Sequence, residues 1–144
     1  MEKETKKILL AIDGSRNSER ALLEASNLGE DSNAEIKILT AIKPLFLPYY
    51  GNVGILKRDN EALEKSKKRL LENSLEFFED YPGKVKTVLR KGDPAEEILA
   101  EAEENDYHLI VMGSKGLGVF TRALLGSVST KVLNHTETNV YIVK

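Results

Sequence analysis

The chain has 144 residues and no cysteine, and this absence removes several kinds of chemistry at once. Without cysteine there are no disulfide bonds, thiolate nucleophiles, cysteine-bound zinc ions or iron–sulfur clusters. Histidine is almost as scarce, because His108 and His135 are the only two in the sequence. They are too few and too far apart for a local metal motif built on histidine.

An excess of charge of one sign is also missing. Lysine and arginine number 21, aspartate and glutamate number 23, and the formal net charge is −2. This balance argues against a strongly basic nucleic-acid-binding domain, and we expect no nucleic-acid partner. Apolar blocks lie between the mixed charges, which distinguishes the chain from an acidic disordered tail.

Long hydrophobic runs are absent too. No run approaches the roughly 18 apolar residues from which a transmembrane helix is inferred, so no membrane partner is expected. Residues 1–7 include acidic side chains and no long apolar core follows them, unlike a signal peptide. We therefore expect a cytoplasmic protein.

Length and composition predict a single domain over residues 1–144. Apolar residues make up 41% of the chain, which is enough for a hydrophobic core. A chain of this size buries roughly two-thirds of the surface that it exposes when unfolded.

Short apolar runs alternate with longer helical periods along the chain. Residues 8–12 form a continuous apolar run, typical of a strand that is buried on both faces. Before the third helix, Asp93 suits the N-cap, Pro94 the first helical position and Glu96 a capping-box carboxylate. Strands are expected at residues 8–12, 34–42, 85–89, 107–112 and 139–143, and helices at 16–28, at 55–78, from Asp93 onward and up to about His135.

This alternation predicts an α/β fold with parallel strands, right-handed crossovers and helices on both faces of the sheet. The segment from Pro44 to Gly54 interrupts the pattern as a long loop, which is usually functional or mobile. Its aromatic residues Phe46, Tyr49 and Tyr50 either pack under the loop or form a lid or partner surface.

Unusual residues follow three of the expected strands. They are Asp13-Gly14-Ser15, the segment 90–93 and the glycine-rich segment 113–118. In open parallel sheets, ligands bind beyond the carboxyl ends of the strands, at a switch in strand order. Asp13-Gly14-Ser15 has a second interpretation, as an ordinary turn and helix cap.

The glycine-rich segment 113–118 predicts an anion site. Glycine allows close approach of the backbone to a ligand, and the free N–H groups of the following helix face an anion. The small residues 126–130 add backbone donors and hydroxyl groups, and Lys115 and Arg122 add positive charge. Phosphate is the ligand expected for such a segment.

Two common phosphate motifs fail here. Gly113 and Gly118 have the separation of a Walker A loop, but residues 119–120 are not the required lysine and hydroxyl residue. Gly116 and Gly118 begin a dinucleotide fingerprint, but Thr121 takes the place of its third glycine.

The full spacing of Gly113, Gly116, Gly126 and Ser127 matches the pattern G-2x-G-9x-G-[S/T], and the chain thereby resembles the universal stress protein family in its ATP-binding branch. The resemblance is weakest over residues 44–71. Asn139 departs from the family, which often has proline before the last strand. Further matching blocks are residues 8–15, 92–94, 109–112 and 128–129, with Val132 and His135.

This resemblance implies a single doubly wound sheet of five parallel strands in the order 3-2-1-4-5, similar to the adenine nucleotide alpha hydrolases. The switch point would lie between the first and fourth strands, beside Asp13. The family's last strand commonly pairs with its copy in a second subunit. Residues 140–143 form an apolar edge strand that needs a cover, so we expect a homodimer.

The resemblance also implies roles for individual residues. Gly113 and Gly116 would contact ribose and phosphate, and Gly126 and Ser127 would close around the β- and γ-phosphates of ATP. Asp13 would lie near the nucleotide or its Mg²⁺ ion. Ala41 would line the adenine slot. The full set expected to bind the nucleotide is Asp13, Ala41, Gly113, Ser114, Lys115, Gly116, Gly126, Ser127, Val128 and Ser129.

Three functions follow from these patterns. The first is an ATP-binding protein of stress response or signalling that acts on an unknown protein partner, with little or no hydrolysis. The second is a slow ATPase or phosphotransferase, in which Asp13 helps to hold a metal and Lys115 neutralises charge. The third is a dimeric scaffold that needs no nucleotide, and a flavin-binding flavodoxin-like protein is a weaker rival.

Overall fold

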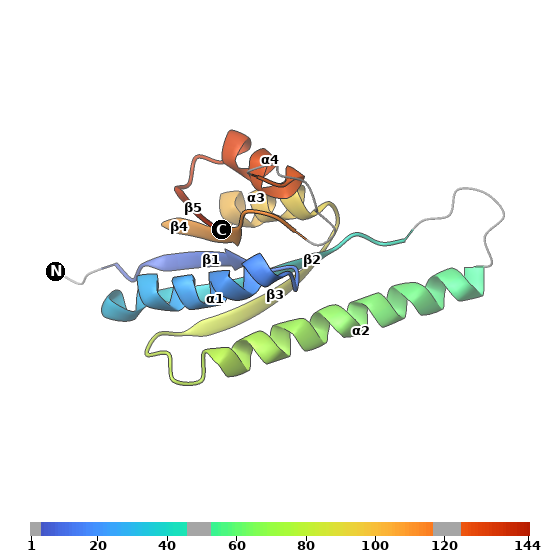
Figure 1. Ribbon diagram of the computed structural model, residues 1–144, viewed down its shortest axis with the longest axis horizontal. Coiled ribbons are helices and arrows are strands. Elements are labelled where there is room, and N and C mark those ends of the chain that lie inside the picture. Colours follow the sequence, from blue (N-terminus) through green and yellow to red (C-terminus); the bar gives the residue numbers. More distant parts are fainter. Residues whose placement is uncertain (1–3, 46–52, 117–124) are drawn as a thin grey trace.

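The computed structural model of the chain describes residues 4–45, 53–116 and 125–144, and it contains one parallel sheet of five strands (Figure 1). The strand order is β3-β2-β1-β4-β5, which confirms the predicted α/β architecture. The strands are β1 (Lys7–Ala11), β2 (Glu35–Ile42), β3 (Val85–Lys91), β4 (Leu109–Gly113) and β5 (Val140–Val143). The helices are α1 (Arg16–Gly29), the short 3₁₀ turn η1 (Glu30–Ser32), α2 (Val53–Phe77), α3 (Pro94–Glu104) and α4 (Ser127–His135).

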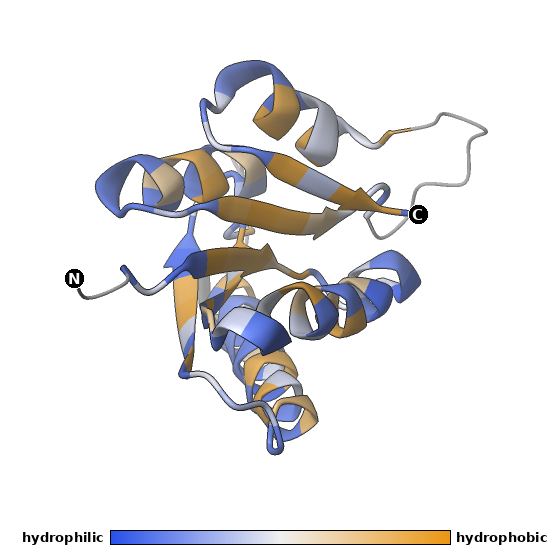
Figure 2. Ribbon diagram, turned by 90° about the vertical axis from the view of Figure 1, so that its left-hand side faces the viewer, coloured by the Kyte–Doolittle hydropathy of each residue, from blue (hydrophilic) through white to orange (hydrophobic). Residues whose placement is uncertain are grey.

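Helices cover both faces of the sheet. On one face α1 packs over β1, β4 and β5, and α2 packs over β2 and β3, while α3 and α4 lie together on the other face (Figure 1). The hydrophobic residues gather in the strands and on the helix sides turned toward them (Figure 2). The fold thus has two apolar layers, one on each side of the sheet.

The central strand β1 contributes to both layers, as its continuous apolar run predicts. Ile8 and Leu10 belong to the cluster under α1 and α2, whereas Leu9 and Ala11 belong to the cluster under α3 and α4. Leu9 and Leu10 are completely buried. Because successive residues of a strand point to opposite faces, both faces of this strand need apolar side chains.

Two turns at the carboxyl ends of strands begin helices with side-chain caps. Ser15 caps α1 by accepting a hydrogen bond from the Ser18 N–H at 3.2 Å, and Gly14 between β1 and α1 has φ +90°. Asp93 caps α3 by accepting from the Glu96 N–H at 3.1 Å. That bond and the nearby Lys131 ammonium hold the pKa of Asp93 below its usual range. The cap positions of Ser15 and Asp93 are therefore confirmed, whereas the Glu96 carboxylate, expected to complete a capping box, bonds to the Lys131 ammonium at 3.2 Å.

Some element bounds differ from the predicted ones. β3 runs on to Lys91 because it continues to pair with β2 up to Ile42. β4 starts at Leu109, two residues later than expected, and Tyr107 instead bonds through its hydroxyl to Glu101. η1 was not expected at all. The aromatic residues expected in the 44–54 loop, Phe46, Tyr49 and Tyr50, lie outside the described residues.

Helix α2 is long, and its N-terminal part extends beyond the sheet (Figure 1). Its outer face is charged as predicted, with an ion pair of 3.4 Å between Lys68 and Glu64 one helical turn apart. Along the described residues, neither this helix nor any other is both long and apolar enough to cross a membrane.

A buried carboxylate joins α3 to the β2–β3 side of the sheet. Glu101 is only 2% exposed, and its carboxylate lies 3.3 Å from the Lys37 ammonium and 3.1 Å from the Arg90 guanidinium. The hydroxyl of Tyr107 and the amide of Asn105 also donate to it, each at 2.8 Å. Burial alone would raise the pKa of Glu101, but these donors and cations outweigh it and lower the pKa below 4.5.

Replacing Glu101 by glutamine should lower the free energy of unfolding at neutral pH by about 3 kcal/mol. This is the lower end for a broken buried ion pair, because Lys37 and Arg90 keep some access to water. Urea unfolding would measure the loss. Glu103, which is exposed on the same helix, supplies the control, and Glu103→Gln should change stability by less than about 0.5 kcal/mol.

The same comparison predicts a pH dependence. Since the pKa of Glu101 is lowered by folding, its contribution is complete above the ordinary value of 4.5 and is lost as the pH falls through the lower value of the folded protein. The stability difference between wild type and Glu101→Gln should therefore shrink in acid. A difference that stays constant down to acid unfolding would contradict this.

Candidate functional site

A cavity of about 330 Å³ opens at the carboxyl ends of β1, β2 and β4. Its volume lies within the range of about 300–1,000 Å³ that small-molecule sites occupy. Apolar side chains from both sheet and helices line its interior, among them Leu39, Ile98 and Met112. Nine of the ten residues expected to bind a ligand line it, namely Asp13, Ala41, Gly113, Lys115, Gly116, Gly126, Ser127, Val128 and Ser129.

Residues 113–116 form the glycine-rich wall of the cavity, which lies directly against the turn that follows β1. A Cβ atom at Gly116 would be 2.7 Å from Oδ2 of Asp13, so no side chain fits there without moving that carboxylate. The other carboxylate oxygen of Asp13 accepts a hydrogen bond of 2.9 Å from the Ser15 N–H. Close contact between these two segments therefore sets the position of the one carboxylate that lines the cavity among the described residues.

Ser114 is the expected residue that the structure does not bring into the cavity lining. It is 3% exposed, and its hydroxyl oxygen accepts a bond of 3.0 Å from the side-chain amide of Asn17. Its N–H donates to the Val143 carbonyl at 2.7 Å, and its carbonyl accepts from the Gly126 N–H at 2.6 Å and from the Ser129 hydroxyl at 2.9 Å. Ser114 thus ties the glycine-rich wall to α1, β5 and α4.

Helix α4 presents its N-terminus to the cavity. Gly126 occupies the N-cap position, so no side chain caps the helix, and Ser127 is exposed. Ser129 turns its hydroxyl inward to the carbonyls of Ser114 and Gly126. The first N–H groups of a helix lack partners within the helix, and together with the helix dipole they favour an anion.

Several cavity residues were not among the ten expected to bind a ligand. Lys43 follows β2, Leu63 and Lys67 come from α2, and Pro94 and Ile98 come from α3. The place of Lys43 two residues after Ala41 was a usable signal. No sequence signal pointed to Lys67, because its helix carries charged residues on most sides and the hydrophobic periodicity could not show which charged residue meets the end of the sheet.

Other highlighted residues do not enter the cavity. Arg90 bonds to Glu101, and Lys91 forms an ion pair of 3.3 Å with Glu64. Gly118 and Arg122 lie outside the described residues. Within the described ranges, no group of three or more histidine or carboxylate side chains is arranged to hold a metal ion.

The chain matches known proteins over nearly its whole length. A model of the universal stress protein family matches residues 4–144. The universal stress protein YxiE of Bacillus subtilis is 33% identical over 145 residues, which cover 96% of this chain and 98% of YxiE. The solved structure of MJ0577 from Methanocaldococcus jannaschii is 30% identical with a TM-score of 0.87, covering 96% of this chain and 95% of that one. A universal stress protein solved in complex with cAMP is 28% identical with a TM-score of 0.64, covering 98% of both chains.

The contact between the glycine-rich wall and α1 predicts a difference between two glycines. Alanine at Gly113 would place its Cβ 2.8 Å from Cβ of Asn17, and we expect Gly113→Ala to cost roughly 1–3 kcal/mol of stability. At Gly126 the nearest atom to a new Cβ is 3.4 Å away and φ is −77°, so Gly126→Ala should lose only the advantage of glycine over alanine as an N-cap residue, a smaller cost.

Urea unfolding of both variants without added nucleotide would test this comparison. Equal stability losses at the two positions would show that the close contact between Gly113 and Asn17 does not exclude a side chain at residue 113.

Proposed function

Because this chain belongs to the universal stress protein family, we propose that it binds an adenine nucleotide, ATP, in the cavity at the carboxyl ends of β1, β2 and β4. The observation that carries the proposal is the convergence of nine expected residues on one cavity from four separate segments of the chain. A relative of similar length is solved with the adenine nucleotide cAMP, which supports the choice of ligand class.

The cavity has an apolar part and a glycine-rich part, and these suit the adenine and the phosphate ends of such a ligand. Adenine is flat and largely apolar, and we place it in the slot beside Ala41, where Leu39 and Ile98 also line the cavity. The adenine edge would bond to backbone groups after β2. Ribose and the first phosphate would lie along Gly113 and Gly116, where the backbone is open to close approach.

The remaining phosphates would lie at the N-terminus of α4. Gly126 and Ser127 offer backbone donors and an exposed hydroxyl there, and Lys115 lines the same cavity. Asp13 would provide one carboxylate for a Mg²⁺ ion that arrives with the phosphates. This fits the chemistry of Mg²⁺, which usually binds through one or two carboxylates together with substrate phosphates and water.

We further propose that binding, rather than turnover, is the biological activity, in a stress-response or signalling role. Asp13 is the one acidic residue that lines the cavity among the described residues, and no histidine does. A ligand that binds one conformation better than another shifts the population toward it, and a protein partner could read that shift.

Calorimetric titration of nucleotide-free protein with Mg-ATP should give a dissociation constant in the micromolar range, equivalent to about −8 kcal/mol. Gly116→Val should abolish binding, because its side chain would displace Asp13 and occupy the cavity. Ala62→Val introduces the same residue at an exposed position of α2 outside the cavity lining and should bind normally.

Thermal unfolding of both variants would show that they are folded. If the folded wild-type protein, freed of any copurified nucleotide, binds neither ATP nor ADP nor AMP, a nucleotide-independent dimeric scaffold becomes the better account.

We also propose a homodimer through the outer edge of β5. Alternate residues of a parallel strand bond to the same neighbour, and here the Asn139 carbonyl accepts from Ile110 of β4 and the Val143 carbonyl from Ser114 directly after β4. The backbone groups of Val140 and Ile142 therefore face away from β4. An apolar edge strand with free N–H groups readily pairs with another chain.

Sedimentation of the wild-type protein should show a dimer, and Ile142→Pro should shift it to monomer, because proline removes an outward N–H that pairing needs. Asn139→Pro introduces the same residue just before β5 and should leave the dimer intact. A wild-type protein that stays monomeric at high concentration would contradict this proposal.

A further inference from the structure

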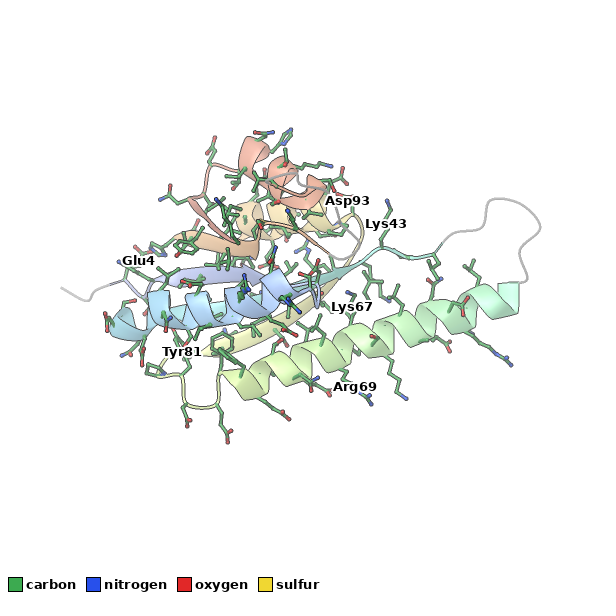
Figure 3. The ribbon with its side chains drawn as sticks, in the orientation of Figure 1. Glu4, Lys43, Lys67, Arg69, Tyr81 and Asp93 are labelled. Carbon is green, nitrogen blue, oxygen red and sulfur yellow. The ribbon has the colours of Figure 1, made fainter. Side chains whose placement is uncertain are left out.

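Lys67 brings a positive charge to the cavity from α2, a helix that contributes nothing to the glycine motif. Its side chain lines the cavity, and its ammonium donates a hydrogen bond of 3.1 Å to the main-chain carbonyl of Asp13. In Figure 3, Lys67 lies between α2 and the carboxyl end of the sheet, whereas Arg69 points to the opposite side of the helix. The two cations are only two residues apart, so helix geometry alone separates their surroundings.

The packing of α2 holds Lys67 in this place. Residues four apart lie on one face of a helix, and Leu63 and Leu71 flank Lys67 at that spacing. Leu63 lines the cavity and Leu71 is buried in the core. The methyl groups of Leu70 come within 3.8 Å of the position that a Cβ of Gly14 would take, in the turn after β1. This face of α2 is therefore seated against the sheet end on both sides of Lys67.

In the described part of the chain, no carboxylate of the surrounding helices pairs with the charge of Lys67. Among the residues that the structure describes, no aspartate or glutamate lies within ion-pair distance of its ammonium. The neighbouring cations differ, since Lys68 and Lys91 both pair with Glu64. An ammonium group has three donors, and the bond to the Asp13 carbonyl uses one of them.

The cavity as a whole therefore favours a polyanion. Lys43, Lys67 and Lys115 line it from three different elements, while Asp13 is the one carboxylate of its described lining. A triphosphate carries more negative charge than a monophosphate or a cyclic monophosphate, and Coulomb attraction grows with that charge. A cation beside the Asp13 turn, contributed by α2, therefore attracts a triphosphate more strongly than a monophosphate.

We propose that Lys67 is a specificity-determining residue that contacts the phosphate groups of the bound nucleotide and favours the triphosphate over the monophosphate. This inference rests on the proposed function and deepens it, because it assigns the choice among adenine nucleotides to a residue of α2. The glycine-rich wall and the slot beside Ala41 serve every adenine nucleotide, whereas Lys67 separates them by charge.

The test compares the affinities of ATP, AMP and adenosine in two variants of Lys67. Glutamine keeps an N–H donor for the Asp13 carbonyl but has no charge, whereas methionine lacks both. Lys67→Gln should weaken ATP binding about tenfold, the scale of one charge-assisted hydrogen bond, weaken AMP binding less and leave adenosine unchanged. Lys67→Met should lower the ATP affinity at least as far, and Lys67→Arg should keep the preference for ATP.

Lys65→Gln is the matched control, because Lys65 is exposed on the same helix and lies outside the cavity lining. It makes the same change of charge and should leave all three affinities unaltered. Calorimetry at one fixed ionic strength would measure the affinities, and thermal unfolding would confirm that each variant is folded.

Two outcomes would overturn the proposal, and they differ. If the wild-type protein binds ATP but Lys67→Gln leaves the ratio of ATP to AMP affinity unchanged, Lys67 only supports the Asp13 turn, and the proposed function stands without it. If the wild-type protein binds none of the three ligands, the proposed function itself fails and the role of Lys67 falls with it.

Discussion

The close contact between the carboxyl end of β4 and the turn after β1 is the constraint on which the cavity depends. Gly113 lies against Asn17, and Gly116 lies against the carboxylate of Asp13, with no room for a Cβ atom at either position. Adjacent parallel strands bring these ends together, since β1 and β4 are paired neighbours at the switch in strand order. A side chain at Gly113 would press against Asn17 of α1, and one at Gly116 would displace the Asp13 carboxylate from its place at the cavity.

Ser114 extends that contact to the rest of the molecule. Its hydroxyl, N–H and carbonyl bond to groups from α1, β5 and α4, so a single buried residue connects the cavity wall to the edge strand. A buried polar group is expensive unless it is bonded, and Ser114 uses all of these partners. Serine at this position therefore holds the glycine-rich wall in place, while the neighbouring Lys115 and Gly116 line the cavity.

The ion pairs that join helices to the two faces of the sheet differ in burial. The pair of Lys91 in β3 with Glu64 in α2 is partly exposed to solvent, whereas α3 is joined to β2 and β3 through the buried carboxylate of Glu101, which pairs with Lys37 and Arg90. Such pairs add directionality, since charged hydrogen bonds fix geometry more narrowly than apolar packing. The placement of Pro94 and Ile98 in the cavity lining depends on where this helix sits.

The sequence alone determined the order of the main helices and strands, the parallel sheet, the capped turns at Ser15 and Asp93, and four of the segments that meet at the cavity. These features depend on residues close together in the chain, where hydrophobic period, turn chemistry and glycine spacing act directly. Only the tertiary structure decided that Ser114 turns away from the cavity, that Glu101 is buried and that Lys67 reaches Asp13. Each of these contacts joins elements that are distant in sequence, and the seating of one helix against the sheet decides which of its charged residues meets a partner. Local patterns cannot specify that seating, because a charged helix offers similar side chains on several of its faces.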